Sequence, residues 1–123
     1  ILAIAALLLG AEKSVAVDID PQALTAARDN AVLNGVADRL DIVMAEEFEG
    51  SEYDVVLANI LAGPLIDLAG LLTTCLRSNG DLVLSGVLDS QLAQVQSAYL
   101  KDINFVGQAD REGWVCAHGK RCC

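Results

Sequence analysis

The sequence is poor in aromatic and basic residues and has no cysteine pattern suited to a metal. Aromatic side chains make up 4% of the 123 residues although 54% are hydrophobic, which favours the aliphatic interior of an α/β fold over a β-sandwich. There are 8 basic residues against 17 acidic ones, a net charge of −9. Such a chain lacks the basic patch that holds a nucleic-acid backbone. The acidic charge suits a basic protein partner, and it equally fits ordinary solubility charge.

The four cysteines include no CxxC pair, and His118 is the single histidine. The ligand spacing of a zinc site is therefore absent, and we expect no bound metal. Cys122 and Cys123 are adjacent, which is a poor geometry for an ordinary disulfide. Free thiols in a reducing cytoplasm are the expectation. His118 has no second ligand or nucleophile placed beside it, so it is assigned no role.

The chain begins with an apolar run, residues 1–9, that is too short to span a bilayer. The run also lacks the basic region and the cleavage site of a signal peptide. It is better explained as a buried helix from Ile1 to Gly10, packed on more than one side. Because this helix is already under way where the sequence starts without a methionine, we expect a fragment of a longer cytoplasmic protein with no membrane partner.

Strands and helices alternate along the chain up to about residue 101. The patterns predict strands over 14–17, 40–44, 53–59 and 81–85, and helices over 21–34, 65–77 and 91–101. The strand 53–59 has a continuous apolar centre, as in a sheet covered on both faces. Two last strands, 105–109 and 114–117, predict a closing antiparallel hairpin. This order indicates one domain, or part of one, with an α/β fold: a doubly wound, mostly parallel sheet with the hairpin as an antiparallel edge.

The stretch from Ser14 to Ala27 contains the first candidate functional residue. A short buried strand stops at Asp18, and a helix begins almost at once. Asp20 is placed to accept from the free amides of the first helical turn, and Pro21 occupies the first helical position. Asp18 stands outside this cap, at the strand end where α/β folds bind ligands and where a carboxylate can take both hydroxyls of a ribose. The alternative for Asp18 is a solvated carboxylate at the start of a loop.

Asn59 ends the strand 53–59, so in a parallel sheet it projects toward the same rim as Asp18. Its amide offers an acceptor and donors, which can orient an amine to be alkylated although the amide is a poor base. A hydrogen bond to the turn 61–64 is an equally good explanation. Glu46 follows the strand 40–44 in an acidic segment and is a further candidate for contact with a cofactor. The alternative for that segment is a solvated charge run.

Several strings resemble the class I methyltransferase domain that uses S-adenosylmethionine: VAVDIDPQAL at 15–24, RDNA at 28–31 and NG at 34–35. Three later strings, ANILAGPL at 58–65, LSGVL at 84–88 and EGWV at 112–115, narrow the resemblance to the PrmA family. These bacterial enzymes methylate the ribosomal large-subunit protein eleven. The resemblance covers essentially all 123 residues, and NILA at 59–62 is its most specific piece.

The resemblance implies a seven-stranded sheet with an antiparallel last strand and S-adenosylmethionine as cofactor. It also implies transfer of methyl groups to lysine side-chain and N-terminal amino groups of the ribosomal protein. Asp18 matches the family's ribose-binding acidic residue, and Asn59 matches the asparagine beside the cofactor and the methyl-accepting amine. Asn59 is thus the candidate catalytic residue, and Asp18, Glu46 and Asn59 are the candidate cofactor contacts. Catalysis would rest on proximity and alignment of the amine with the sulfonium methyl.

Some parts of the family pattern would precede Ile1: the first strand, the glycine-rich loop after it and the N-terminal domain that recognises the ribosomal protein. Residues 1–123 are therefore expected to form a partial methyltransferase domain. In the family sheet the absent strand lies between the strands that end at Asp18 and Asn59, and its loss would leave two unpaired edges. We expect the chain alone to fold poorly or to pair with another copy. Lys120 and Arg121 fit the family's basic tail, whereas the two cysteines that follow depart from it.

Two hypotheses from other classes stay open at this point. An NAD-binding dehydrogenase domain would explain Asp18, but it would explain neither the NILA string nor the closing hairpin. A catalytically inactive fragment that survives by self-association would explain the absent glycine-rich loop. Among methyltransferases, a small-molecule or glutamine-modifying relative is a further alternative, although many such relatives carry Asn-Pro-Pro-Tyr where this chain has residues 59–62.

Overall fold

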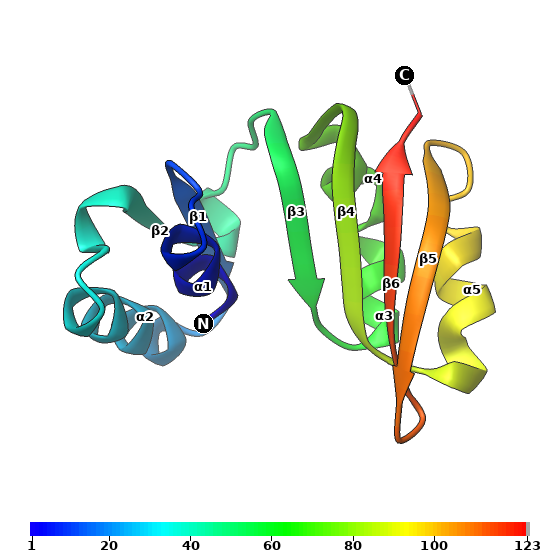
Figure 1. The fold of residues 1–123 in the computed structure, drawn as a ribbon, viewed down its shortest axis with the longest axis horizontal. Helices are drawn as coiled ribbons and strands as arrows, with labels where there is room; N and C mark the ends of the chain where they lie inside the picture. Colours follow the sequence, from blue (N-terminus) through cyan, green and yellow to red (C-terminus); the bar gives the residue numbers. More distant parts are fainter. Residues whose placement is uncertain (123) are drawn as a thin grey trace. The chain divides into compact units, whose positions relative to one another are not determined.

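The computed structural model describes residues 1–122, which form two units, residues 1–49 and the chain from Gly50 onward. The first unit contains α1 (Leu2–Leu8), β1 (Ser14–Asp18), α2 (Pro21–Leu33), η1 (Ala37–Arg39), β2 (Leu40–Met44) and η2 (Ala45–Glu47). The second contains β3 (Tyr53–Asn59), α3 (Ala62–Asp67), α4 (Ala69–Thr74), β4 (Leu76–Leu88), η3 (Asp89–Gln91), α5 (Leu92–Ser97), β5 (Ile103–Arg111) and β6 (Trp114–Arg121) (Figure 1). The predicted alternation of strands and helices is confirmed.

The first unit is a strand–helix–strand arrangement preceded by a helix. β1 and β2 pair in parallel, with Asp18 opposite Met44 at their carboxyl ends. Helix α2 starts as predicted, because Asp20 caps it and Pro21 takes its first position. The small core of this unit combines residues of α1, α2, the following loop and β2: Ile4, Leu7, Ala31, Val36 and Leu40.

Helix α1 buries a single stripe rather than packing on several sides. Ile4 and Leu7, three residues apart, lie on one face of the helix and are 6% and 2% exposed. Leu8 and Leu9 are 58% and 89% exposed. Within this chain, therefore, the expected burial of the apolar run on more than one side is not found.

The second unit is a four-stranded sheet in the order β3-β4-β6-β5. β3 and β4 are parallel, and β6 is antiparallel to both of its neighbours. The predicted β5–β6 hairpin is confirmed, and its turn has positive φ at Glu112 (54°) and Gly113 (85°), as a type I′ turn requires. The prediction that the hairpin adds an antiparallel edge to the sheet is also confirmed, with β6 next to β4 and β5 as the edge strand.

The helix predicted over 65–77 is two short helices. A single residue, Leu68, separates α3 from α4, and its backbone (φ −92°, ψ 4°) leaves the helical region. β4 then starts at Leu76, earlier than the sequence indicated, and its pairing with β3 is irregular until Asp81. Asn79, with φ 63°, lies in this irregular part of β4.

Helices α3, α4 and α5 cover one face of the four-stranded sheet (Figure 1). The core between helices and sheet includes Leu65 of α3, Leu82 and Leu84 of β4, Val95 of α5, and Val115 and Ala117 of β6. On β3, Val56 and Ala58 pack against this core, whereas Val55 and Leu57 are 50% and 40% exposed. Within this chain β3 is therefore covered on one face, not on both as its apolar run suggested.

None of the helices in residues 1–122 is both long and apolar enough to cross a membrane.

Candidate functional site

Asp18 lies at the carboxyl end of β1 and is exposed. Its Oδ1 accepts a hydrogen bond from the backbone N–H of Asp20 at 3.1 Å. Asp20 in turn accepts from the N–H of Gln22 at 2.9 Å, which satisfies one free amide at the start of α2. Asp18 is thus held at the strand–helix turn by one oxygen. Its Oδ2 has no hydrogen-bond partner within residues 1–122, so the carboxylate can accept from a ligand.

Glu46 lies at the same end of the two-stranded sheet as Asp18. Asp18 pairs with Met44, the last residue of β2, and Glu46 follows two residues later in η2. Its side chain is exposed. Ile19, directly after Asp18, is an 80% exposed apolar side chain. The carboxyl ends of β1 and β2 therefore present two carboxylates and one apolar surface.

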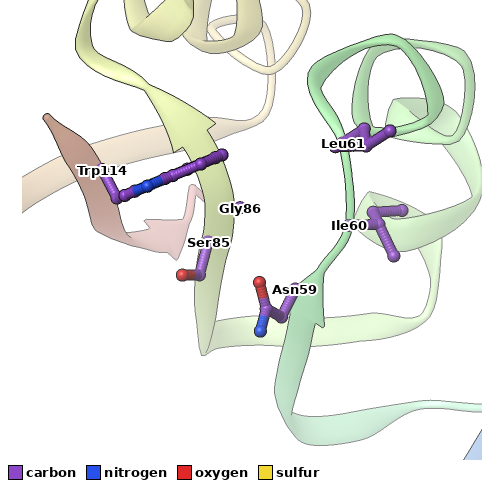
Figure 2. Close-up of a pocket in the computed structure, with 6 residues that line it drawn as sticks. All are labelled: Asn59, Ile60, Leu61, Ser85, Gly86 and Trp114. Atoms are coloured by element: carbon purple, nitrogen blue, oxygen red, sulfur yellow. The ribbon is translucent and has the colours of Figure 1, made fainter.

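Asn59 ends β3 and pairs with Ser85 of β4. It lines a cleft of about 430 Å³ together with Ile60, Leu61, Ser85, Gly86 and Trp114. Figure 2 shows the Asn59 carboxamide directed toward the strand that carries Ser85 and Gly86. The side chain makes no hydrogen bond to another part of residues 1–122, so the proposed bond to the turn 61–64 is not found. Its donor and acceptor are both available to a ligand in the cleft.

The floor of this cleft is formed by a close approach between two backbone segments. Gly86 has φ +86°, and a Cβ atom built on it would lie 2.6 Å from the carbonyl oxygen of Ile60 and 3.0 Å from Oδ1 of Asn59. No ordinary side chain fits in that space. The two acceptor oxygens therefore lie next to the Gly86 Cα.

Trp114 supplies the large apolar side chain of the cleft and is 51% exposed. It is held there by the tight turn between β5 and β6, where Gly113 also accepts a hydrogen bond from the N–H of Asp89 at 2.9 Å. Ser85, Gly86 and Trp114 are functional candidates that the sequence alone did not indicate. The strings that contain them, LSGVL and EGWV, were the available signal, but neither spacing nor periodicity places them beside Asn59.

Asp18 and Glu46 belong to the first unit and Asn59 to the second. Asp18 and Glu46 lie at the same end of the two-stranded sheet, and Asn59 lines a cleft within the second unit. That all three contact one cofactor stays a prediction. Within residues 1–122, no group of three or more His, Cys, Asp or Glu side chains is arranged to hold a metal ion.

The model of the family "Ribosomal protein L11 methyltransferase (PrmA)" matches residues 1–122. A ribosomal protein L11 methyltransferase of Pseudomonas aeruginosa is 49% identical over 122 residues, which are 98% of this chain and 42% of that protein. The chain therefore spans about two-fifths of the length of the curated relatives that it matches.

Solved structures give the same picture of the fold. The ribosomal protein L11 methylase of Lactobacillus delbrueckii subsp. bulgaricus superposes with a TM-score of 0.87 at 32% identity, covering 99% of this chain and 65% of that one. An RNA methyltransferase of Salinibacter ruber, crystallised with S-adenosyl-L-homocysteine, superposes with a TM-score of 0.76 over 98% of this chain and 73% of that one. At 22% identity, the second likeness concerns the fold alone. The α/β methyltransferase fold is that of the sequence prediction.

Proposed function

The chain belongs to the PrmA family of ribosomal protein L11 methyltransferases, and from this premise we propose that it is the cofactor-binding part of a protein methyltransferase. The cofactor in this proposal is S-adenosylmethionine. The methyl group goes to lysine side-chain and N-terminal amino groups of the ribosomal protein L11. The names of the relatives support L11 as the substrate, and the fold neighbour crystallised with S-adenosyl-L-homocysteine supports the cofactor. A ribosomal protein substrate implies action in the cytoplasm.

The carboxyl end of β1 is the proposed ribose site. Asp18 is exposed there with an unpartnered Oδ2, and an ionised carboxylate is an acceptor only, suited to two hydroxyl donors. Ile19 offers apolar surface directly beside it, which the adenine base would remove from water. Glu46 adds a second acceptor two residues beyond the end of β2. These residues supply hydroxyl recognition and an apolar surface, which a nucleoside needs.

The cleft at the end of β3 is the proposed amine site. The Asn59 carboxamide is neutral, so it would orient the amine by accepting one N–H rather than remove a proton as a base. Trp114 offers an aromatic face that attracts an alkylammonium group. When bound, the cofactor supplies an electrophilic methyl on sulfur. Because only a neutral amine has the lone pair that can take this methyl, the bound alkylammonium group would first lose one proton to solvent. The methylated nitrogen would then carry the positive charge that the sulfonium gives up, and it would lose its extra proton to solvent.

The observation that carries the proposal is that both strand-end residues, Asp18 and Asn59, are exposed with polar atoms that no protein group satisfies. Asp18 bonds its own turn through Oδ1 alone and leaves Oδ2 to a ligand, and the Asn59 carboxamide makes no hydrogen bond to the neighbouring turn. The dehydrogenase alternative is not favoured, since the family match extends through the hairpin that such a domain left unexplained.

Calorimetric titration of S-adenosylmethionine into this chain tests the proposal. We expect micromolar binding that Asp18→Ala weakens at least about tenfold, because each hydrogen bond to a charged group contributes about 1.5–3 kcal/mol. Asp29→Ala is the matched control, since Asp29 is an exposed carboxylate on α2 and its loss should leave the affinity unchanged. Equal affinities of the Asp18→Ala variant and the unaltered chain would contradict the ribose site.

A further inference from the structure

We propose that Gly86 is a positioning residue that fixes where the Asn59 carboxamide oxygen and the Ile60 carbonyl oxygen point. It does so by letting the bulged strand β4 pass close to the Asn59–Ile60 peptide. The proposal rests on the proposed function, because it takes Asn59 as the group that meets the methyl-accepting amine, and it adds the Ile60 carbonyl oxygen as a second acceptor.

A β-bulge in β4 places Gly86 beside the end of β3. β4 and β6 pair regularly up to Leu84 and Ala117, and the pairing resumes at Val87 and Val115. Between these pairs β4 advances by three residues and β6 by two, so β4 carries one extra residue. Such bulges bend a strand, and they re-aim side chains beside active sites. Gly86, within this bulge, adopts φ +86°, a conformation that glycine reaches without strain.

The contact itself excludes any side chain at position 86. A Cβ atom there would lie 2.6 Å from the Ile60 carbonyl oxygen, 3.1 Å from the Ile60 carbonyl carbon and 3.0 Å from Asn59 Oδ1. Two of these three atoms are backbone and cannot rotate away. A methyl group at Gly86 must therefore displace the Ile60 peptide, and the Asn59 side chain with it.

Displacement of these oxygens matters because two acceptors fix the direction of an amine more tightly than one. With two N–H groups engaged, the nitrogen lone pair can point only along the remaining direction. A misplacement of about 1 Å costs on the order of 100-fold in rate when alignment carries the catalysis. Gly86 would thus act on the chemical step through Asn59 and Ile60, without touching the substrate.

Gly35 provides a matched control. It has φ +71°, and a Cβ atom built on it would meet nothing within 4 Å. Gly35→Ala therefore introduces the same kind of backbone strain as Gly86→Ala, without the collision. Any effect of Gly86→Ala that Gly35→Ala does not share comes from the contact with Asn59 and Ile60.

Nuclear magnetic resonance on this chain tests the positioning directly. In the unaltered chain we expect nuclear Overhauser contacts from the α protons of Gly86 to the side-chain amide of Asn59 or the backbone amide of Leu61. Gly86→Ala should shift the Asn59 side-chain amide and Ile60 carbonyl resonances, and Gly35→Ala should leave both in place. Absence of the contacts in the unaltered chain, or unshifted resonances in folded Gly86→Ala, overturns the proposal. The unaltered spectrum decides even if the variant does not fold.

The consequence for catalysis is measured in a chimera in which residues 1–122 replace the matching segment of the Pseudomonas aeruginosa relative. We expect Gly86→Ala to lower kcat at least tenfold with the KM for S-adenosylmethionine nearly unchanged. In an Asn59→Ala background the same change should have a smaller effect on kcat, because only the Ile60 carbonyl oxygen is then left to be displaced. If Asn59→Ala alone leaves kcat intact, the proposed amine site fails while the resonance test of Gly86 still stands.

Discussion

The hydroxyl of Tyr99 donates a hydrogen bond of 2.5 Å to the backbone carbonyl oxygen of Leu65, and both residues are buried. Leu65 lies near the end of α3, where the last carbonyls of a helix have no partner within the helix. Tyr99 follows α5 in the chain. The bond therefore joins the two helices that cover one face of the four-stranded sheet, the face whose core includes the strand that ends at Asn59.

Tyr99→Phe should destabilise the chain by about 1–3 kcal/mol, because it leaves a buried carbonyl without a donor while keeping the ring. Urea unfolding followed by circular dichroism measures this change. Thr25→Val is the control, since it removes a hydroxyl that bonds to Pro21 at an exposed position of α2, and it should have a much smaller effect. Equal stabilities of Tyr99→Phe and the unaltered chain would show that the bond contributes nothing.

The same phenol makes stability fall at high pH. Burial raises the pKa of Tyr99 from 10.0 to about 12, because the charged phenolate is disfavoured in the core. Below pH 10 the phenol is protonated in both the folded and the unfolded chain, so this group does not change the free energy of unfolding there. Between pH 10 and 12 the unfolded chain releases the proton first, and the free energy of unfolding decreases. Urea midpoints across this range should fall more steeply for the unaltered chain than for Tyr99→Phe.

Asp81 on β4 joins two residues of β6. Its Oδ1 accepts from Lys120 Nζ at 2.9 Å and from His118 Nε2 at 2.7 Å. These hydrogen bonds, with Lys120 the larger cause and His118 the second, hold the pKa of Asp81 below its usual 3.8. The stabilisation is therefore present above about pH 3.8, and it is lost as the pH falls through the lower folded pKa. His118, for which the sequence predicted no role, is thus one of the two β6 residues that bind Asp81.

Asp81→Asn should cost less than about 1 kcal/mol at pH 7, because exposed ion pairs contribute little. The difference from the unaltered chain should shrink as the pH falls below 3.8. Asp54→Asn provides the comparison, since Asp54 pairs with Arg77 alone, at 2.8 Å and with both side chains well exposed. Thermal unfolding at pH 7 and pH 3 measures both variants. A deficit for Asp81→Asn that grows in acid would contradict this account.

Local chemistry explains what the sequence predicted well. The turn from β1 into α2 depends on Asp20 and Pro21, neighbours whose cap and fixed φ act within one helical turn. The hairpin turn depends on residues 112–113 in the same way. Asp18 and Asn59 follow from these local signals, because a strand end is visible in the sequence and its rim is where such folds bind ligands.

The features that sequence reasoning missed depend on contacts between distant segments. β6 pairs with both β4 and β5. The alternation of strands and helices along the sequence does not determine which strands pair. The bulge at Gly86 depends on the pairing of β4 with β6 and on the carbonyl of Ile60. Trp114 reaches the cleft of Asn59 only through that same strand order. Periodicity and spacing therefore could not predict the half of the cleft that β4 and β6 form.

Self-association of the isolated chain is the last prediction, and its cause lies in the strand edges. Among residues 1–122, β1 pairs only with β2, and β3 pairs only with β4. On β3, Val55 and Leu57 are 50% and 40% exposed, so an apolar surface accompanies the open edge. Exposed apolar edge strands are templates for pairing with another chain.

We expect size-exclusion chromatography with light scattering to give a mass above that of one chain, rising with concentration. Val55→Lys should shift the distribution toward the monomer, because a lysine on an edge strand opposes pairing. Leu33→Lys is the control, since Leu33 is 82% exposed and lies on helix α2 rather than on a strand. If β3 carries the association, the control stays associated while Val55→Lys does not. A monodisperse monomer that melts cooperatively would refute the prediction, because the open edges would then be harmless in this chain.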